Sequence, residues 1–509
     1  METKTAAIEM RNITKRFGPV LANDKVWLNI YRGEILALLG ENGSGKTTLM
    51  NMLSGIYFPD EGEIKIDGKE VVIRSPKDAF DNGIGMIHQH FKLVDVLTAA
   101  ENIVLGLPGK LDLKAASAKI REICDKYGFS VDPAQKIYDM SVSQKQTVEI
   151  VKVLYRGADI LILDEPTAVL TPQETDKLFA VLRNMRNDGK AIVIITHKMH
   201  EVEALSDRVA ILRHGQFIGD MLTAHTNAQE MTNMMVGHAV SLNIECPDPV
   251  DPKPRIEVKG LTVRSVDGIV KLDDVSFTAN SGEILGIAGI SGCGQKELLE
   301  AIAGLQTVES GSISYIEDDG SREELIGKDP LSIAELGVSL SFVPEDRLGM
   351  GLVGNMNLAD NMMLRSFRRG KSIFTDRRSP RALAESVVQE LSVSTPSVDT
   401  PVRRLSGGNV QKVLVGREIA SAPTVLLTAY AVRGLDIHSS YTIYDLINRQ
   451  KKAGVAVIFV GEDLDVLLEL CDRILVLCGG KVSGIVSGRG AEKREVGMMM
   501  TKLGGQSHE

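Results

Sequence analysis

A glycine-rich stretch has the residue types and spacing needed to hold a phosphate group. It reads Gly40-Glu41-Asn42-Gly43-Ser44-Gly45-Lys46-Thr47-Thr48 and matches the pattern G-x-x-x-x-G-K-[ST]-T in full. Glycines let a backbone fold tightly around an anion, and a following helix adds partial positive charge. Lys46 can reach the β- and γ-phosphates, and the Thr47 hydroxyl can ligate Mg²⁺. Because an apolar run precedes the stretch and a helix-compatible segment follows it, we expect a nucleoside triphosphate site rather than an ordinary glycine turn.

Two carboxylates follow another apolar run. Asp164 and Glu165 come directly after Ile160–Leu163, which has the pattern of a buried parallel strand. An acid at such a strand end can hold Mg²⁺ and its water shell, and a neighbouring acid can orient and deprotonate an attacking water. The alternative interpretation is a solvated strand end. The pair therefore predicts hydrolysis of the bound triphosphate.

Three further side chains suit the same chemistry and are informative only in combination. His197 follows the apolar run Ala191–Ile195 and could contact the γ-phosphate. Gln89 could contact Mg²⁺ and the attacking water, and Phe17 could stack on an adenine ring. Taken singly, such a histidine is more often structural, such a phenylalanine is more often in a core, and the glutamine is uninformative.

These residues must be positioned by a domain that occurs twice, because 509 residues are too many for one core. The offset between the copies grows along the chain, so the second copy carries inserted residues. We expect the insertions in the polar, loop-like segments Glu317–Asp329 and Ser366–Pro380. The recurring segments are Ile8–Thr14 with Ile256–Thr262, Arg32–Leu36 with Ser281–Leu285, and Ser206–Arg208 with Cys471–Arg473.

The repeat predicts domains at residues 1–242 and 255–509, joined by a short, stiff, proline-rich linker at 243–254. Each copy opens with short alternating strands and then alternates buried strands with amphipathic helices. The pattern indicates an α/β domain that binds phosphate at the carboxyl ends of its strands.

Composition argues against several classes of protein. Apolar content of 43% and charged content of 25% are ordinary for a globular chain. The net charge of −9 argues against nucleic-acid binding. The longest apolar stretches fall short of the ~18 residues that a membrane-spanning helix needs. Five scattered cysteines without a CxxC pair indicate reduced thiols in the cytosol and no metal role.

The second copy keeps the outline of the first and loses its reactive groups. Without the lysine, the metal ligands and the base, hydrolysis there should fall below detection. Gln295 stands in place of Lys46, Lys296 in place of Thr47, Glu345 in place of Gln89, Ala429-Tyr430 in place of Asp164-Glu165, and Glu462 in place of His197.

The ordered set resembles the nucleotide-binding domain of ABC transporters, in both halves and over nearly the whole chain. The resemblance implies two tandem P-loop NTPase domains, each with an antiparallel β subdomain, a parallel-sheet core and a helical subdomain. It implies ATP and Mg²⁺ as cofactors, and Lys46 as a catalytic residue. The other implied roles are adenine platform for Phe17, phosphate loop for residues 40–48, Mg²⁺ ligand for Thr47, Gln89 and Asp164, general base for Glu165, and γ-phosphate switch for His197.

The family signature LSGGQ differs between the copies. The first copy reads Met140-Ser141-Val142-Ser143-Gln144, without either glycine, whereas the second reads Leu405-Ser406-Gly407-Gly408-Asn409. In the family, each ATP lies between the phosphate loop of one domain and the signature of the other. The resemblance therefore implies one working ATP site, shared by residues 40–48 and by Ser406, Gly407 and Gly408. It also implies an intramolecular pseudo-dimer that needs no second copy of the chain.

A fused pair with this asymmetry resembles the ATPase subunit of sugar-type importers, and the segments Gly85–Leu93, Leu97–Ile103 and Gly292–Gln295 are closer to its nucleoside-type branch. The implied partners are two membrane-spanning permease subunits and an extracytoplasmic solute-binding lipoprotein, without nucleic acid. The implied location is peripheral, on the cytoplasmic face of the cell membrane. Two alternatives remain open. One is a ribose-, galactose- or xylose-type importer, and the other is a soluble twin-ABC ATPase acting on ribosomes, a class that usually has two complete sites and a long interdomain segment.

Overall fold

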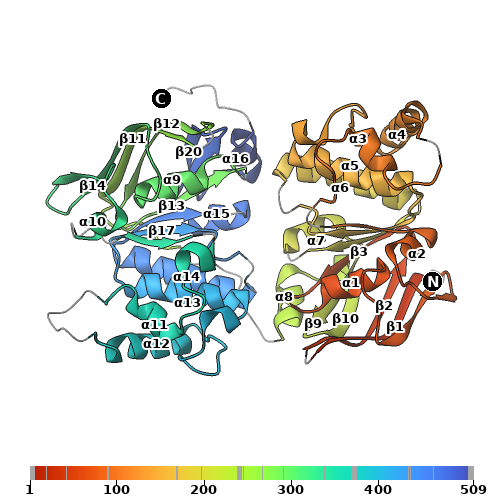
Figure 1. Ribbon diagram of the computed structural model, residues 1–509, viewed down its shortest axis with the longest axis horizontal. Helices are drawn as coiled ribbons and strands as arrows, with labels where there is room; N and C mark the ends of the chain where they lie inside the picture. Colours follow the sequence, from red (N-terminus) through yellow and green to blue (C-terminus); the bar gives the residue numbers. More distant parts are fainter. Residues whose placement is uncertain are drawn as a thin grey trace. The chain divides into compact units, whose positions relative to one another are not determined.

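The structure is a computed structural model in which the chain divides into two compact units, Met1–Ser241 and Leu242–Glu509 (Figure 1). Of the expected linker, residues 244 and 246–254 are described, and the predicted domain limits stay predictions. The predicted site residues Asn42, Gln89 and His197 lie outside the described residues. The structure describes residues 6–18, 20–41, 43–88, 91–109, 111–167, 170–196, 198–237, 244, 246–265, 268–290, 292–335, 340–344, 346–367, 375–433, 435, 437–461 and 463–501.

The strands of the first unit form two sheets. In the described residues, an antiparallel sheet has the order β2-β1-β4-β5 and a larger sheet has the order β10-β9-β3-β8-β7-β6. β3 pairs in parallel with β8 and β9, and only β10 runs antiparallel in the larger sheet as described. The strands are β1 (Ala6–Phe17), β2 (Val20–Tyr31), β3 (Glu34–Leu39), β4 (Glu61–Ile66), β5 (Lys69–Val71), β6 (Ile84–Ile87), β7 (Ile160–Asp164), β8 (Ala191–Ile195), β9 (Arg208–Arg213) and β10 (Gln216–Leu222).

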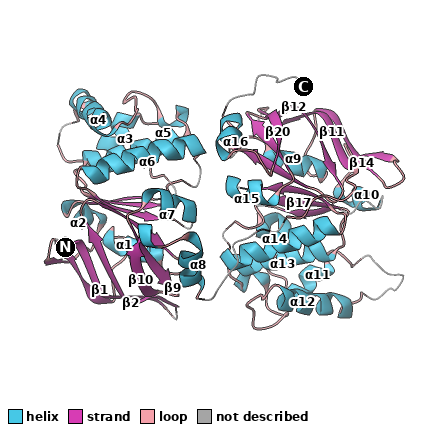
Figure 2. Cartoon of the chain, turned by 180° about the vertical axis from the view of Figure 1, so that it is seen from behind, coloured by secondary structure: helices cyan, strands magenta, loops and turns pink. Residues whose placement is uncertain are grey.

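The helices of the first unit contribute residues to two hydrophobic cores. Residues of α1 share one core with both sheets, while α3, α4 and α5 enclose a separate core and form a helical subdomain at one end of the unit (Figures 1 and 2). β3, β7 and β8 are buried along their whole lengths, as expected for parallel strands covered on both faces. The helices are α1 (Lys46–Leu53), α2 (Pro76–Asp81), α3 (Ala99–Val104), α4 (Leu113–Tyr127), α5 (Val142–Tyr155), α6 (Pro172–Asn187), α7 (Met199–Leu205) and α8 (Ala228–Val236).

The second unit repeats this plan strand for strand. Its sheets have the orders β12-β11-β14-β15 and β16-β17-β18-β13-β19-β20. The repetition confirms the expected fold class of two tandem α/β domains, each with an antiparallel subdomain and a mainly parallel core. The strands are β11 (Pro254–Arg264), β12 (Val270–Asn280), β13 (Ile284–Gly289), β14 (Ser310–Ile316), β15 (Arg322–Glu324), β16 (Leu340–Val343), β17 (Val425–Ala429), β18 (Ala456–Val460), β19 (Arg473–Cys478) and β20 (Lys481–Ser487).

The second unit differs from the sequence-based expectation in both inserted segments. We expected Ser366–Pro380 to be a loop, but its last three residues begin α12, and residues 368–374 lie outside the described part. We expected Glu317–Asp329 to be a loop, but Arg322–Glu324 forms β15, which pairs with β14. A π-helical turn at Arg347–Gly351 precedes the helical subdomain. The helices are α9 (Gln295–Ile302), α10 (Pro330–Glu335), α11 (Leu358–Met363), α12 (Arg378–Glu390), α13 (Gly407–Ala420), α14 (Ile437–Lys452), α15 (Leu464–Leu470) and α16 (Lys493–Met499).

Within the described part of the chain, every helix is too short or too polar to cross a lipid bilayer.

A buried ion pair explains why two distant segments recur together. In the first unit, Arg208 Nη2 lies 2.8 Å from Glu34 Oε1, and both side chains are almost completely buried. Next to this pair, the Ile35 N–H donates to Asp207 Oδ2 at 2.8 Å. These contacts tie the start of β3 to the start of β9, the neighbouring strand.

The second unit contains the same contacts. Arg473 Nη2 donates to Glu283 Oε2 at 3.0 Å, and the Ile284 N–H donates to Asp472 Oδ2 at 2.8 Å. The repeated Gly-Glu-Ile and Asp-Arg segments therefore meet in space, and their recurrence reflects one packing requirement met twice.

We predict that Arg208→Met destabilises the first unit by about 3–5 kcal/mol, because it leaves the Glu34 carboxylate buried without its partner. The matched control is Arg32→Met, which breaks an exposed pair with Asp67 and should cost less than ~1 kcal/mol. Trp27, the single tryptophan of the chain, lies in β2, so its fluorescence during urea unfolding reports on the first unit alone. Equal shifts in the two variants would contradict the prediction.

Candidate functional site

The glycine-rich stretch forms a tight turn between β3 and α1. Gly43 and Gly45 have φ values of 82° and 96°, in the left-handed region that favours glycine. A Cβ atom on Gly45 would lie 2.3 Å from the backbone oxygen of Ala22, so no larger residue fits there. Lys46 is the first residue of α1 and is only 7% exposed. Its Nζ donates to the backbone oxygens of Gly40 at 2.7 Å and Glu41 at 2.9 Å, so the ammonium lies over the turn.

Asp164 lies beside this turn at the end of β7. The Thr47 hydroxyl donates to Asp164 Oδ2 at 3.3 Å. Burial, and secondly the nearby charge of Glu165, raise the pKa of Asp164. Burial lowers the pKa of Lys46, while the two carboxylates act in the opposite direction. A buried carboxylate and a hydroxyl are oxygen ligands of the kind that Mg²⁺ prefers, so Thr47 and Asp164 fit that ion.

Glu165 occupies a strained turn directly after β7. Its φ is 49°, which is unusual for a residue with a side chain, and its N–H donates to the backbone oxygen of Ile195 at 2.9 Å. This bond joins the end of β7 to the end of β8. Thr196, which follows β8, is described, whereas His197 lies outside the described residues. The proposed roles of His197 and Gln89 therefore stay predictions.

Phe17 lies at the end of β1 and is 41% exposed, which disfavours the interpretation of Phe17 as a core residue. Its ring meets that of Tyr57 edge to face, with 5.1 Å between the centroids. Lys15 Nζ lies 5.6 Å from the centroid of the Phe17 ring. An exposed, edge-supported ring is suited to stacking on a flat aromatic ligand. The role of Tyr57 could not be predicted from the sequence.

A buried polar network around Glu201 of α7 was also missed by the sequence analysis. Glu201 is 2% exposed, and the Thr167 hydroxyl donates to its Oε1. The Thr196 hydroxyl donates to Glu201 Oε2 at 3.3 Å, and Lys198 Nζ lies 3.2 Å from Oε1. The available signal was an acid four residues after His197, but a single sequence does not show that this acid is buried.

The two signature segments both begin a helix. The Ser141 side chain accepts from the Gln144 N–H at 3.3 Å and caps α5. The side chain of Val142 is 39% exposed at the position where the second unit has a glycine. In the second unit, the Ser406 side chain caps α13 and accepts from Asn409 Nδ2 at 2.9 Å. Both serines are therefore held in the same local geometry, and the glycines distinguish the segments.

An arginine supports the signature of the second unit. Arg347 Nη1 donates to the backbone oxygen of Gly407 at 3.0 Å, and its Nη2 donates to the backbone oxygen of Arg433. A Cβ atom on Gly407 would lie 3.2 Å from Arg347 Nη1, so glycine permits the close approach. Burial and the nearby charge of Arg433 lower the pKa of Arg347. The first unit has Phe91 and Val142 at the corresponding positions, so it lacks both partners of this contact.

The degenerate site of the second unit keeps its backbone shape. Gly294 has a φ of 98°, and Tyr430 has a φ of 54° with its N–H donating to the backbone oxygen of Val460 at 2.9 Å. Lys296 is paired with Glu300 Oε1 at 3.7 Å. Ala429 ends β17, so in the described part of this site no carboxylate remains at the strand end. These residues do not fit Mg²⁺.

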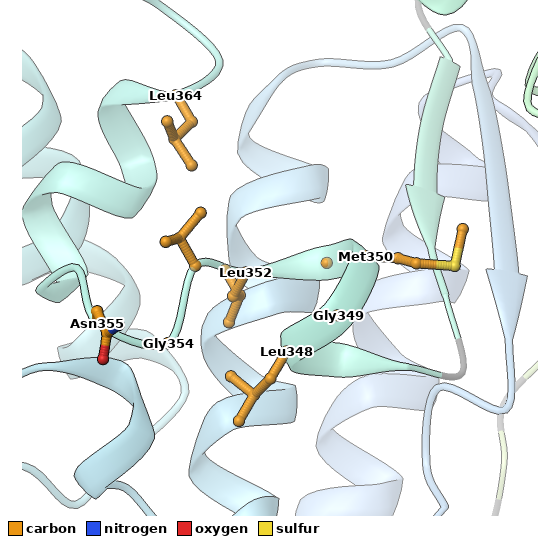
Figure 3. Close-up of a pocket in the computed structure, with 9 residues that line it drawn as sticks. Leu348, Gly349, Met350, Leu352, Gly354, Asn355 and Leu364 are labelled. Atoms are coloured by element: carbon orange, nitrogen blue, oxygen red, sulfur yellow. The ribbon is translucent and has the colours of Figure 1, made fainter.

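A hollow of about 470 Å³ lies beside the π-helical turn of the second unit, and Leu348–Asn355 and Leu364 line it (Figure 3). The buried side chain of Asn361 holds the loop that forms its wall, because its Oδ1 accepts from the Val353 N–H at 2.8 Å. Asn102 holds Val94 of the first unit in the same way, at 2.7 Å. A matching asparagine thus anchors the loop after β6 and after β16.

The chain matches one protein family twice and is similar along its length to several import ATP-binding proteins. The family model described as "ABC transporter" matches residues 23–168 and again residues 272–428. The nucleoside import ATP-binding protein NupA of Lactococcus lactis is 42% identical, with 99% of each chain covered. The glucose import ATP-binding protein TsgD13 of Haloferax volcanii is 39% identical, covering 98% of this chain and 96% of the relative. The guanosine import ATP-binding protein NupO of Bacillus subtilis is 40% identical, with 97% of each chain covered.

We predict that Asp164→Asn stabilises the first unit at pH 7 when neither nucleotide nor Mg²⁺ is present. Burial raises the pKa of Asp164 above its unfolded value, so its ionised form destabilises the folded unit at neutral pH. That destabilisation develops as the pH rises through the folded pKa, and the gain in the variant should shrink as the pH falls toward ~4. Each kcal/mol of relief should raise Tm by about 2–4 °C. In the control Asp159→Asn, the replaced side chain is 58% exposed and Tm should barely change. A lower Tm for Asp164→Asn at pH 7 would refute the argument.

Proposed function

The chain belongs to the ABC transporter family as an ATPase with two nucleotide-binding domains, and we propose that it is the motor subunit that energises nucleoside import. The observation that carries the nucleoside proposal is the 42% identity, over 99% of both chains, to a nucleoside import ATP-binding protein. The nucleoside-type segments Gly85–Leu93 and Gly292–Gln295 support the same choice.

In the proposed reaction, the first unit binds ATP and supplies the reactive groups. Phe17 stacks on the adenine, and the Lys46 ammonium exchanges its backbone partners for phosphate oxygens. Thr47 and Asp164, together with Gln89, would hold Mg²⁺, which would offset the negative charge of the β- and γ-phosphates. Glu165 accepts a proton from the attacking water, and His197 contacts the γ-phosphate.

The second unit contributes its signature to that reaction. The two units have lost different parts of the site. The unit with Lys46 lacks the signature glycines, and the unit with Gly407 lacks the lysine. Independent loss at two complete sites would not give that division. We therefore assign Ser406, Gly407 and Gly408 to the ATP that Lys46 binds.

The proposed partners are two membrane-spanning permease subunits and an extracytoplasmic solute-binding lipoprotein, with the chain peripheral on the cytoplasmic face of the membrane. The hollow beside Arg347–Gly351 is our candidate for contact with a permease. Leu348 and Met350 are 44% and 46% exposed there. In this proposal an apolar element of a permease packs against these two side chains.

Two other functions compete with nucleoside import. Sugar import is favoured by the 39% identity to a glucose import ATP-binding protein. A twin-ABC ATPase acting on ribosomes is disfavoured by the short proline-rich segment between the domains and by the dismantled second site.

The assignment of Ser406 predicts opposite outcomes for two homologous serines. Ser406→Arg should lower ATP turnover by about 10²-fold or more, because it removes a donor placed for the γ-phosphate and inserts a long side chain. Ser141→Arg should be much milder, although Ser141 shares a unit with Lys46. Steady-state ATPase rates of the purified transporter test both, with Glu165→Gln, which should lower turnover by about 10²-fold or more, as the low-activity reference. Loss confined to Ser141→Arg would overturn the assignment, and equal loss would mean that both signatures are required.

The cargo is tested in the complex reconstituted with both permeases and the binding protein. We expect binding protein loaded with a nucleoside such as guanosine to stimulate ATPase activity, and ribose or glucose to be without effect. Stimulation by a pentose or hexose alone would place the protein with the sugar importers, and the absence of any stimulation would contradict an importer function.

A further inference from the structure

The Glu201 carboxylate binds two segments of the first unit that are distant in sequence. One segment follows β7 and contains Thr167, whose hydroxyl donates to Glu201 Oε1. The other follows β8 and contains Thr196, whose hydroxyl donates to Glu201 Oε2 at 3.3 Å. Both carboxylate oxygens therefore accept hydrogen bonds, and together they connect the two segments.

Lys198 completes this network. Its Nζ lies 3.2 Å from Glu201 Oε1 and donates to the backbone oxygen of Thr167 at 3.4 Å, while its N–H donates to the Thr196 hydroxyl at 3.1 Å. A carboxylate that is only 2% exposed requires such partners, because an unpaired buried charge is strongly destabilising. The network is thus satisfied within the described residues.

The position of these partners connects them to the chemistry. Thr167 lies two residues after Glu165, and Thr196 and Lys198 flank His197 on either side. Glu201 does not itself reach the reacting groups through any contact described here. It instead connects Thr167, which follows the proposed base, to Thr196 and Lys198, the residues on either side of position 197.

The second unit supplies an internal control. Val432, Gly461 and Val466 stand where Thr167, Thr196 and Glu201 stand in the first unit, as set by the alignment of Ala429-Tyr430 with Asp164-Glu165. Val432 and Val466 pack against the hydrophobic core, so the polar network is absent from this described part of the second unit.

One other buried polar contact, an ion pair, is kept in the second unit. The Glu34–Arg208 pair returns as Glu283–Arg473, although that unit has lost its reactive residues. The fold therefore needs the ion pair but can be built without the Glu201 network. The network is retained only in the unit that retains the base.

We propose that Glu201 is a positioning residue for ATP hydrolysis, which holds the Glu165 and His197 segments in a fixed relation. The inference rests on the proposed roles of Glu165 and His197. When Glu201 is lost, the phosphate loop still binds ATP, but the base and switch segments no longer meet the γ-phosphate in one geometry.

The test compares Glu201→Val, which copies the second unit, with Glu203→Gln. Glu203 lies on the same helix with an exposed side chain that accepts from the Ala228 N–H, so its variant controls for changes to α7. Glu201→Val should lower kcat for ATP by roughly 10- to 100-fold, the size expected when a catalytic group is displaced by about 1 Å. The KM for ATP should stay within about 2-fold, and Glu203→Gln should match the wild type.

Two further variants separate positioning from stability. Thr167→Val removes one donor to the Glu201 carboxylate but leaves Lys198 and Thr196 in place, so it should lower both kcat and Tm by less than Glu201→Val. In a Glu165→Gln background, Glu201→Val should reduce the residual rate little further, because both changes act on the same step. An unchanged kcat in both Glu201→Val and Thr167→Val would overturn the proposal, as would a full additional loss in the double variant. A wild-type complex without ATPase activity would instead refute the proposed function itself.

Discussion

The first unit depends on keeping an ammonium and a carboxylate buried together at one edge of a parallel sheet. Burial shifts the pKa of Lys46 downward and that of Asp164 upward, so each charge is held in a place that disfavours it and is eased by the other. Much of the surrounding architecture serves this arrangement. β8 separates β3 from β7 and sets the width of the site, the glycines allow the turn that carries Lys46, and the strained backbone at Glu165 brings a second carboxylate to the same edge.

The sequence alone was sufficient to predict the features that depend on a local pattern of residues. Spacing and periodicity were enough to predict the phosphate loop at residues 40–48, the buried strands and the internal repeat. It was insufficient where a role depends on burial or on a distant partner, as for Glu201 and Arg347, whose contacts lie 34 and 60 residues away. The polar strand Arg322–Glu324 was mistaken for a loop, since a three-residue edge strand is held by its neighbour rather than by its own apolar residues.

The two units show which parts of this domain belong to folding and which to chemistry. The ion pair between the first strand of the parallel core and its neighbour occurs in both, and so does the asparagine that anchors the loop after the edge strand. The lysine, the acids and the Glu201 network occur in one, and the arginine that supports the signature occurs in the other. The scaffold is thus shared, and the active groups are divided between its copies.

The left-handed backbone at Tyr430 carries a consequence for how such asymmetry arises. A residue with a side chain in that conformation costs on the order of 1 kcal/mol or more, yet the turn persists in the unit that no longer has an acid there. The turn must therefore be required by packing, through the bond from Tyr430 to Val460. After duplication of an ancestral gene, the acids could consequently be replaced one at a time without changing the backbone conformation of this turn. The same tolerance gives protein engineers a ready framework for rebuilding a second motor by side-chain exchange.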